Sequence, residues 1–180
     1  MISGKKIYLT AVEKNDLNQL KHWRNNPNFR KYFREYRELN DEMQNNWFDK
    51  FVVNDKNTIM FSIRDITNQQ LLGCCGLCYI NWVHRHADLS FYIGKDNLYV
   101  DDIYALEAVD LLIKYGFNEL GLNKIWTEIY EFDKMKINLL QKYGFKRDGQ
   151  LRENYFYDGK WWDSIIFCLL RREFNDPILT

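Results

Sequence analysis

Hydrophobic positions along the first part of the chain predict one strand followed by two helices. Residues 6–11 alternate apolar and polar side chains, which is typical of a short strand. A helix is expected over residues 15–26, because its leucines and tryptophan recur at helical spacing and Pro27 prevents its continuation. A second helix is expected to follow Asp41, which stands with Gln44 at the spacing of a capping box.

The middle of the chain predicts three strands and one long helix. Two β-prone runs, residues 58–66 and 71–80, are joined by four polar residues and favour an antiparallel hairpin. A further strand is expected over residues 87–94. A loop over residues 95–102 then leads into an amphipathic helix that should end near Gly121, because glycine accepts the left-handed conformation after a helix C-terminus.

The last part of the chain predicts a strand, a helix and a hairpin. The strand covers residues 124–130, and the helix runs from Asp133, a suitable N-cap, to Gly144. Residues 153–157 and 160–170 form the hairpin. The whole order predicts an α/β fold with a mixed, largely antiparallel central sheet, four flanking helices, one parallel step and a C-terminal hairpin.

The composition fits one globular domain over residues 1–180. The chain is 46% hydrophobic and 28% charged, and no apolar run approaches the ~20 residues that span a bilayer. No apolar run follows the first lysines, so we expect a cytoplasmic protein without a membrane partner. Lys plus Arg equals Asp plus Glu at 25 each, which disfavours a nucleic-acid partner. The cysteines lack zinc-ligand spacing, so no metal is expected.

Four segments carry a resemblance to a known family. They are Trp23-Arg24-Asn25, residues 87–94, residues 107–122 and residues 139–145. Together with the order of elements, they resemble the GNAT acyltransferases, especially the branch that acetylates protein N-termini, antibiotics and amino sugars. The resemblance implies a transferase, monomeric or homodimeric, that moves an acetyl group from acetyl-CoA to a primary amine. The acceptor would be a small molecule, such as an amino sugar or an amino-acid-like compound, or a peptide N-terminus.

The resemblance also implies where the donor binds. In such enzymes the strand matching Phe91, Tyr92 and Ile93 diverges from the strand matching residues 127–129, and the pantetheine arm lies in the opening. Backbone groups at the opening can pair with the amides of the arm, and an N–H group can polarise the thioester carbonyl. Phe91, Tyr92 and Ile93 are therefore candidate donor-binding residues.

The loop before the helix departs from the family pattern. Relatives usually carry Arg/Gln-x-x-Gly-x-Gly/Ala there, since glycines let backbone N–H groups approach the pyrophosphate. The matching candidates here are Val100, Asp101, Asp102 and Ile103. The two aspartates can instead cap the helix, and they would repel a pyrophosphate. Three alternatives follow: Lys95 turns inward in their place, the donor is carried on an acyl carrier protein, or the domain is a noncatalytic binding module.

Candidate catalytic residues lie on the strand and the helix that follow. Glu128 is the candidate base, because a narrow cleft can raise the pKa of a carboxyl; a surface ion pair is the alternative. Relatives place a tyrosine that protonates the thiolate where this chain has Leu140. Tyr143, one turn later, is the candidate acid, with plain packing as its alternative. Asp133 replaces an asparagine that contacts the donor in relatives, and its simplest role is the N-cap.

The segment between the first two helices is the candidate acceptor site. It holds several arginines among tyrosines and phenylalanines. Guanidinium groups suit carboxylates and phosphates, while aromatic rings suit sugars or bases. The candidate acceptor-binding residues are Trp23, Arg24, Arg30 and Tyr36, and the alternative is a solvated basic surface.

Overall fold

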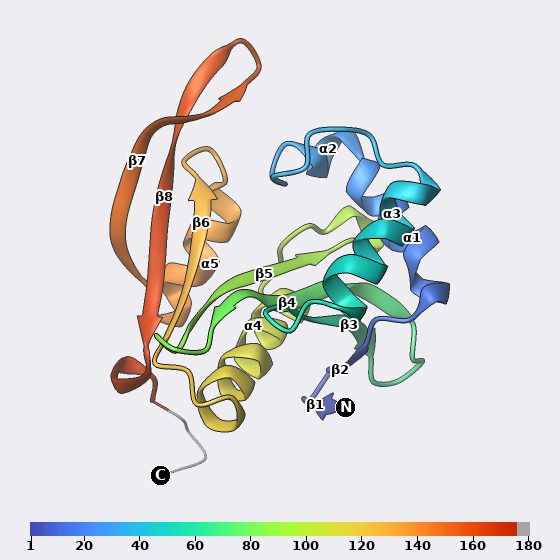
Figure 1. The fold of residues 1–180 in the computed structure, drawn as a ribbon, viewed down its shortest axis with the longest axis horizontal. Helices are drawn as coiled ribbons and strands as arrows, with labels where there is room; N and C mark the ends of the chain where they lie inside the picture. Colours follow the sequence, from blue (N-terminus) through green and yellow to red (C-terminus); the bar gives the residue numbers. More distant parts are fainter. Residues whose placement is uncertain (176–180) are drawn as a thin grey trace.

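The computed structural model describes residues 1–175 as a mixed sheet flanked by helices (Figure 1). The strands are β1 (Ile2–Ser3), β2 (Ile7–Ala11), β3 (Ile59–Asp65), β4 (Leu71–Asn81), β5 (His86–Ile93), β6 (Lys124–Tyr130), β7 (Lys146–Tyr157) and β8 (Lys160–Leu170). The α-helices are α1 (Leu17–Asn25), α2 (Pro27–Arg30), α3 (Asp41–Trp47), α4 (Tyr104–Lys114) and α5 (Lys134–Tyr143).

All the strands join one sheet in the order β1-β2-β3-β4-β5-β6-β8-β7. Neighbouring strands are antiparallel except β5 and β6, which are parallel because α4 crosses between them. In Figure 1 the group of α1, α2 and α3 lies on the right and the long β7–β8 hairpin on the left, with β5 and β6 between them. The predicted mixed, largely antiparallel sheet with flanking helices and a C-terminal hairpin is confirmed.

Helix α4 packs against the middle of the sheet through small and branched side chains. Ala105, Ala108, Val109 and Leu112 are fully buried. Alanines on the buried face let the helix axis approach the strands, so the apolar stripe predicted from the sequence becomes the centre of the core. The helix continues as a wider turn over Tyr115–Glu119, and the chain reverses at Gly121, whose φ of 65° is left-handed as predicted.

Several element boundaries differ from the prediction. The side chain of Asn40, not Asp41, caps α3 by accepting the N–H of Met43 at 2.8 Å. The chain also forms β1 and α2, which the hydrophobic pattern did not predict. Strand β7 begins at Lys146 rather than at residue 153, and its register shifts near Glu153, whose φ of 51° is left-handed. Nearly all side chains in the first half of the strand are exposed, so this half lacks the apolar alternation that marks a half-buried strand.

Candidate active site

The parallel pairing of β5 with β6 is short. Residues are paired only from His86 with Lys124 to Asp88 with Trp126, and beyond that point the described strands diverge. Figure 1 shows the upper parts of β5 and β6 turning away from each other. The opening that the resemblance implies, between Phe91 to Ile93 and residues 127–129, is therefore present.

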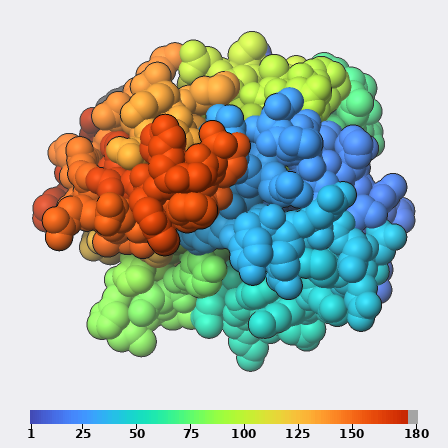
Figure 2. Space-filling model, turned by 90° about the horizontal axis from the view of Figure 1, so that it is seen from above, coloured from blue at the N-terminus to red at the C-terminus, as the bar shows by residue number. Residues whose placement is uncertain are grey.

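A cavity of about 720 Å³ opens beside this divergence. It is lined by α1, α3, the segment that follows α2, and strands β3 to β6, together with Asp133 and Lys136 at the start of α5. Figure 2 shows the β7–β8 hairpin lying against the segment of the first helices. Tyr155 of β7 donates its hydroxyl proton to the carbonyl of Lys31 at 3.2 Å, which holds the two parts together.

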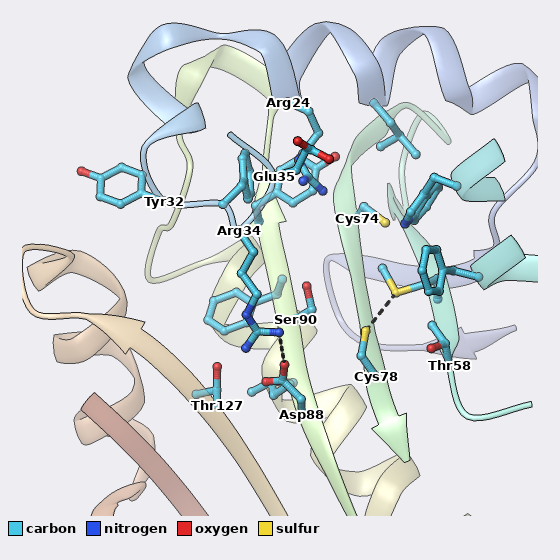
Figure 3. Close-up of a pocket in the computed structure, with 18 of the residues that line it drawn as sticks. Arg24, Tyr32, Arg34, Glu35, Thr58, Cys74, Cys78, Asp88, Ser90 and Thr127 are labelled. Atoms are coloured by element: carbon cyan, nitrogen blue, oxygen red, sulfur yellow. Dashed lines mark hydrogen bonds and ion pairs between the residues drawn. The ribbon is translucent and has the colours of Figure 1, made fainter. Parts of the chain in front are cut away.

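Asp88 lies where the strands separate, and its side chain enters the cavity. Only 3% of the residue is exposed, and Arg34 Nη1 donates to its Oδ2 at 2.8 Å (Figure 3). Burial raises the pKa of Asp88 to about 6, although the Arg34 charge opposes the shift. Asp88 was absent from the predicted site. A carboxylate inside the apolar run of residues 87–94 was the signal that could have identified it.

Glu128, the predicted base, also lines the cavity but is held by several partners. Its Oε1 accepts from the Ser164 hydroxyl at 2.7 Å and from the Asn154 side chain at 2.8 Å. Its Oε2 lies 3.7 Å from Arg34 Nη2. These contacts satisfy much of its acceptor capacity, so the geometry favours Asp88 over Glu128 as the group that accepts a proton.

Tyr143, the predicted acid, faces away from the opening. Its hydroxyl donates to Asp110 Oδ1 on α4 at 2.9 Å, and Tyr143 does not belong to the cavity lining. Leu140 is fully buried. The side chain that does reach the opening from α5 is Lys136, which stands one turn before Leu140 and which sequence reasoning missed. Its spacing of three residues from Asp133 and four from Leu140 places all three on one helix face.

Lys136 and the loop before α4 occupy the edge of β5 that faces the opening. The Lys136 ammonium donates to the Phe91 carbonyl at 3.1 Å. The Ile93 N–H donates to the Tyr99 carbonyl at 2.8 Å. A strand-like amide added to this edge pairs with such a carbonyl and N–H, so a pantetheine arm must exchange with these two contacts. Tyr92 points to the other face, where it is buried against Phe33.

The loop residues that match the pyrophosphate loop of relatives bind the protein itself. The Asp101 carboxylate accepts the N–H groups of Tyr104 at 3.2 Å and Ala105 at 2.7 Å, so it caps α4. Asp102 is exposed and pairs with Lys142 at 3.1 Å, while Val100 is buried and Ile103 is half exposed. A diphosphate does not fit this helix N-terminus, because a carboxylate already uses its donors. A thioester arm can pair with the edge of β5 only by displacing the Lys136 ammonium and the Tyr99 carbonyl.

Asp133 connects this loop to α5. Its Oδ1 accepts the N–H of Lys136 at 3.1 Å, which confirms the predicted N-cap. Its Oδ2 accepts the buried hydroxyl proton of Tyr99 at 2.6 Å, and the Tyr99 ring stacks on Tyr32 with centroids 4.3 Å apart. Loop, helix and acceptor segment are thus fixed together at one side of the cavity.

The predicted acceptor residues divide into those that reach the cavity and those that do not. Trp23 is buried against Gly94 and leaves no room for a Cβ there, so its role is packing. Arg30 lies 3.9 Å from Glu38, and Tyr36 is 76% exposed; neither lines the cavity. Arg24 does line it, with its guanidinium 4.1 Å from the centroid of the Phe33 ring.

Two further arginines join Arg24 in the cavity. Arg34 binds Asp88, and Arg37 donates to Glu35 through Nε at 2.8 Å and Nη2 at 2.7 Å. The hydrogen bonds from Arg37 lower the pKa of Glu35 to about 2. Figure 3 places Arg24 beside Glu35, away from the Arg34 and Asp88 pair. Guanidinium groups therefore stand at two places along one cavity.

Comparison with known proteins identifies the family. Residues 6–146 match the model of the acetyltransferase (GNAT) domain, so the chain belongs to this family, as predicted. It is 32% identical to the uncharacterized N-acetyltransferase p20 of Bacillus licheniformis over 114 residues, which span 63% of each chain. It is 27% identical to the spermidine N(1)-acetyltransferase of Vibrio cholerae, over 93% of this chain and 95% of that one.

The fold agrees with a solved structure of this family. The crystal structure of spermidine N-acetyltransferase from Vibrio cholerae in complex with CoA and spermine superposes with a TM-score of 0.85, at 24% identity, over 93% of this chain and 97% of that chain. That likeness establishes the shared fold. Together with the names of the relatives, family membership supports the prediction of an acyltransferase. Among residues 1–175, each helix is too short or too polar to cross a bilayer.

The cap at Asp101 can be tested by its effect on stability. Asp101→Ala should lower the free energy of unfolding by about 1 kcal/mol, because two N–H groups of α4 lose their acceptor. Asp102→Ala is the matched control. It should lower the free energy of unfolding by only a few tenths of a kcal/mol, since exposed ion pairs contribute ~0–1 kcal/mol. Urea denaturation measures both. Equal losses for the two variants would contradict the assignment of Asp101 as the cap.

Proposed function

We propose that the chain transfers an acetyl group from a thioester, with acetyl-CoA as the expected donor, to the primary amine of an acceptor that also carries a carboxylate or phosphate. The observation that carries this proposal is the position of Asp88. It lies where the opening beside β5 meets the cavity that holds Arg24, Arg34 and Arg37. A donor thioester in the opening and an amine in the cavity would therefore meet beside one buried carboxylate.

Asp88 has the properties of a general base. An attacking amine must be neutral, and a nearby carboxylate accepts its proton most effectively when the pKa of the carboxyl is close to the working pH. Burial raises the pKa of Asp88 to about 6, and Arg34 fixes the orientation of the carboxylate. The negative charge of Glu128 also disfavours a charged Asp88, so it raises the pKa of Asp88 in the same direction as burial does.

The charges in the cavity support an anionic acceptor. Arg34 and Arg37 each bind a carboxylate of the protein, whereas the Arg24 guanidinium stacks on Phe33 beside the cavity. An arginine held flat on an aromatic ring presents its edge to a carboxylate or a phosphate. Five cations and four carboxylates line the cavity, so its net charge is slightly positive and disfavours a polyamine, which carries positive charges alone. We therefore propose an amino acid or a phosphorylated or nucleotide-linked amino sugar rather than spermidine.

A second candidate function is a module that takes its acyl group from a carrier protein or performs no catalysis. One observation favours it: the protein fills both the N-terminus of α4 and the edge of β5 with its own groups. A donor without a free diphosphate needs only the opening beside β5. Turnover with free acetyl-CoA and a suitable amine would exclude this candidate.

Asp88→Asn tests the base. Removing a general base should lower kcat/KM by about 10²–10⁴-fold. The wild-type kcat/KM should fall as the pH drops below about 6, because the raised pKa of Asp88 leaves the carboxyl protonated there. The inflection near pH 6 should be absent in Asp88→Asn, where only the fall caused by protonation of the acceptor amine remains. Release of free thiol at a series of pH values measures both.

Glu128→Gln serves as the matched variant for this test. It should lose much less activity than Asp88→Asn and should keep the inflection near pH 6. The reverse ranking, with Glu128→Gln nearly inactive and Asp88→Asn active, would return the base to Glu128.

Arg24→Met tests the acceptor class, with Arg30→Met as the control outside the cavity. Loss of a charge-assisted hydrogen bond costs ~1.5–3 kcal/mol, so the acceptor KM should rise about 10–100-fold in Arg24→Met. An amino acid should be preferred over its carboxamide, and an amino sugar phosphate over the free sugar. Steady-state kinetics with these pairs decides the matter. Equal effects of the two substitutions, or spermidine as the best acceptor, would refute the anionic class.

A further inference from the structure

Lys136 is a partly buried cation inside the opening between β5 and β6. It lies in the first turn of α5, and its ammonium donates to the Phe91 carbonyl at 3.1 Å. The nitrogen also lies 4.6 Å from the centroid of the Phe91 ring and 5.2 Å from that of Tyr99. Its side chain belongs to the lining of the cavity that contains Asp88.

The proposed reaction needs a proton at this place. When an amine attacks a thioester, the new C–N bond replaces the C–S bond, and the electron pair of the broken bond stays on sulfur. An alkyl thiolate leaves more readily when a proton reaches it, because the pKa of an alkyl thiol is about 8.5 and the thiol is the main form at neutral pH. Leu140 offers no proton, and Tyr143 donates to Asp110 on α4.

We propose that Lys136 is a catalytic residue that gives its proton to the sulfur of the leaving thiol. This assignment rests on the proposed acyl transfer. A donor amide that pairs with the Phe91 carbonyl takes the place of the ammonium, and the flexible lysine stem carries Nζ along the opening toward the sulfur. Asp88 receives the proton that the amine loses, Lys136 supplies the proton that the thiolate gains, and solvent returns one proton from Asp88 to Lys136.

The surroundings of Lys136 suit this exchange. Burial lowers the pKa of the ammonium, and the charges of Arg34 and Arg24 act in the same direction. The carboxylates of Asp133 and Asp88 act in the opposite direction and favour the charged form. A lysine whose pKa moves toward that of a thiol gives up its proton with a smaller energetic cost than a solvated lysine.

The first experiment uses free CoA as the probe, because it is the product thiol. Thiolate absorbance of bound CoA, followed from low to high pH, reports the pKa of its thiol. A cation within ~4–6 Å lowers the pKa of an acid by about 1–3 units, so a shift in this range in the wild-type protein shows that the ammonium reaches the sulfur, and the leaving-group experiment below tests whether it gives up its proton. Lys136→Met should abolish the shift. Lys134→Met, an exposed lysine on the same helix, is the matched control and should retain it.

The second experiment varies the leaving group. Lys136→Met should slow turnover of acetyl-CoA strongly but should barely affect an acetyl ester of an acidic aryl thiol, which leaves without a proton. Lys136→Arg should keep the shifted pKa of the bound thiol but should not restore turnover, because arginine does not release a proton. Melting temperatures of the variants show whether they fold.

The outcomes separate the two proposals. If CoA binds to the wild-type protein and its thiol has the same pKa in the wild type and in Lys136→Met, the assignment of Lys136 is wrong while acyl transfer survives. An equal loss of rate with both classes of thioester would also overturn it, since a purely structural role predicts that result. If CoA fails to bind to the wild-type protein, the proposed function itself fails.

Discussion

The rest of the site depends on the early end of the parallel ladder between β5 and β6. The last pair is Asp88 with Trp126, and the strands separate beyond it. Separation exposes one edge of β5 to the opening and brings Asp88 to the boundary between the opening and the acceptor cavity. Because backbone groups at a strand edge must be satisfied, the protein fills this edge with Lys136 and with the Tyr99 carbonyl. In the proposed mechanism, one break in the sheet thus places the donor, the base and the proton donor.

The charges around this break form two groups that serve different ends. Arg34 binds Asp88 and lies close to Glu128, so one cation reduces the repulsion between these two carboxylates. Arg24 stands beside Glu35 and Arg37 toward the acceptor end of the cavity. A relative that acts on spermidine shares the fold, but these guanidinium groups favour an acceptor with a negative charge. The family therefore defines the reaction class more firmly than the acceptor.

Local patterns in the sequence were sufficient to predict most helices and strands and the family. Period-two runs, helix caps and the glycines at 121 and 144 marked most elements, and the order of elements with the segment at residues 87–94 indicated the family. Contacts between distant segments could not be predicted in this way. Arg34 meets Asp88 across 54 positions of sequence, and Lys136 meets Phe91 across 45. Trp23 was predicted to bind the acceptor because of its short motif, and the structure shows its ring packed on the glycine at position 94.

We propose that the opening beside β5 holds the acyl thioester arm and that the N-terminus of α4 holds no diphosphate. Calorimetric titration of the protein with CoA and with pantetheine separates these two contributions to binding. We expect that both compounds bind, and that CoA binds at most about tenfold more tightly, a difference of about 1.4 kcal/mol. Failure of both compounds to bind, or a preference for CoA of several hundredfold, would contradict it. The second result would mean that the loop of Asp101 and Asp102 rearranges to hold the diphosphate.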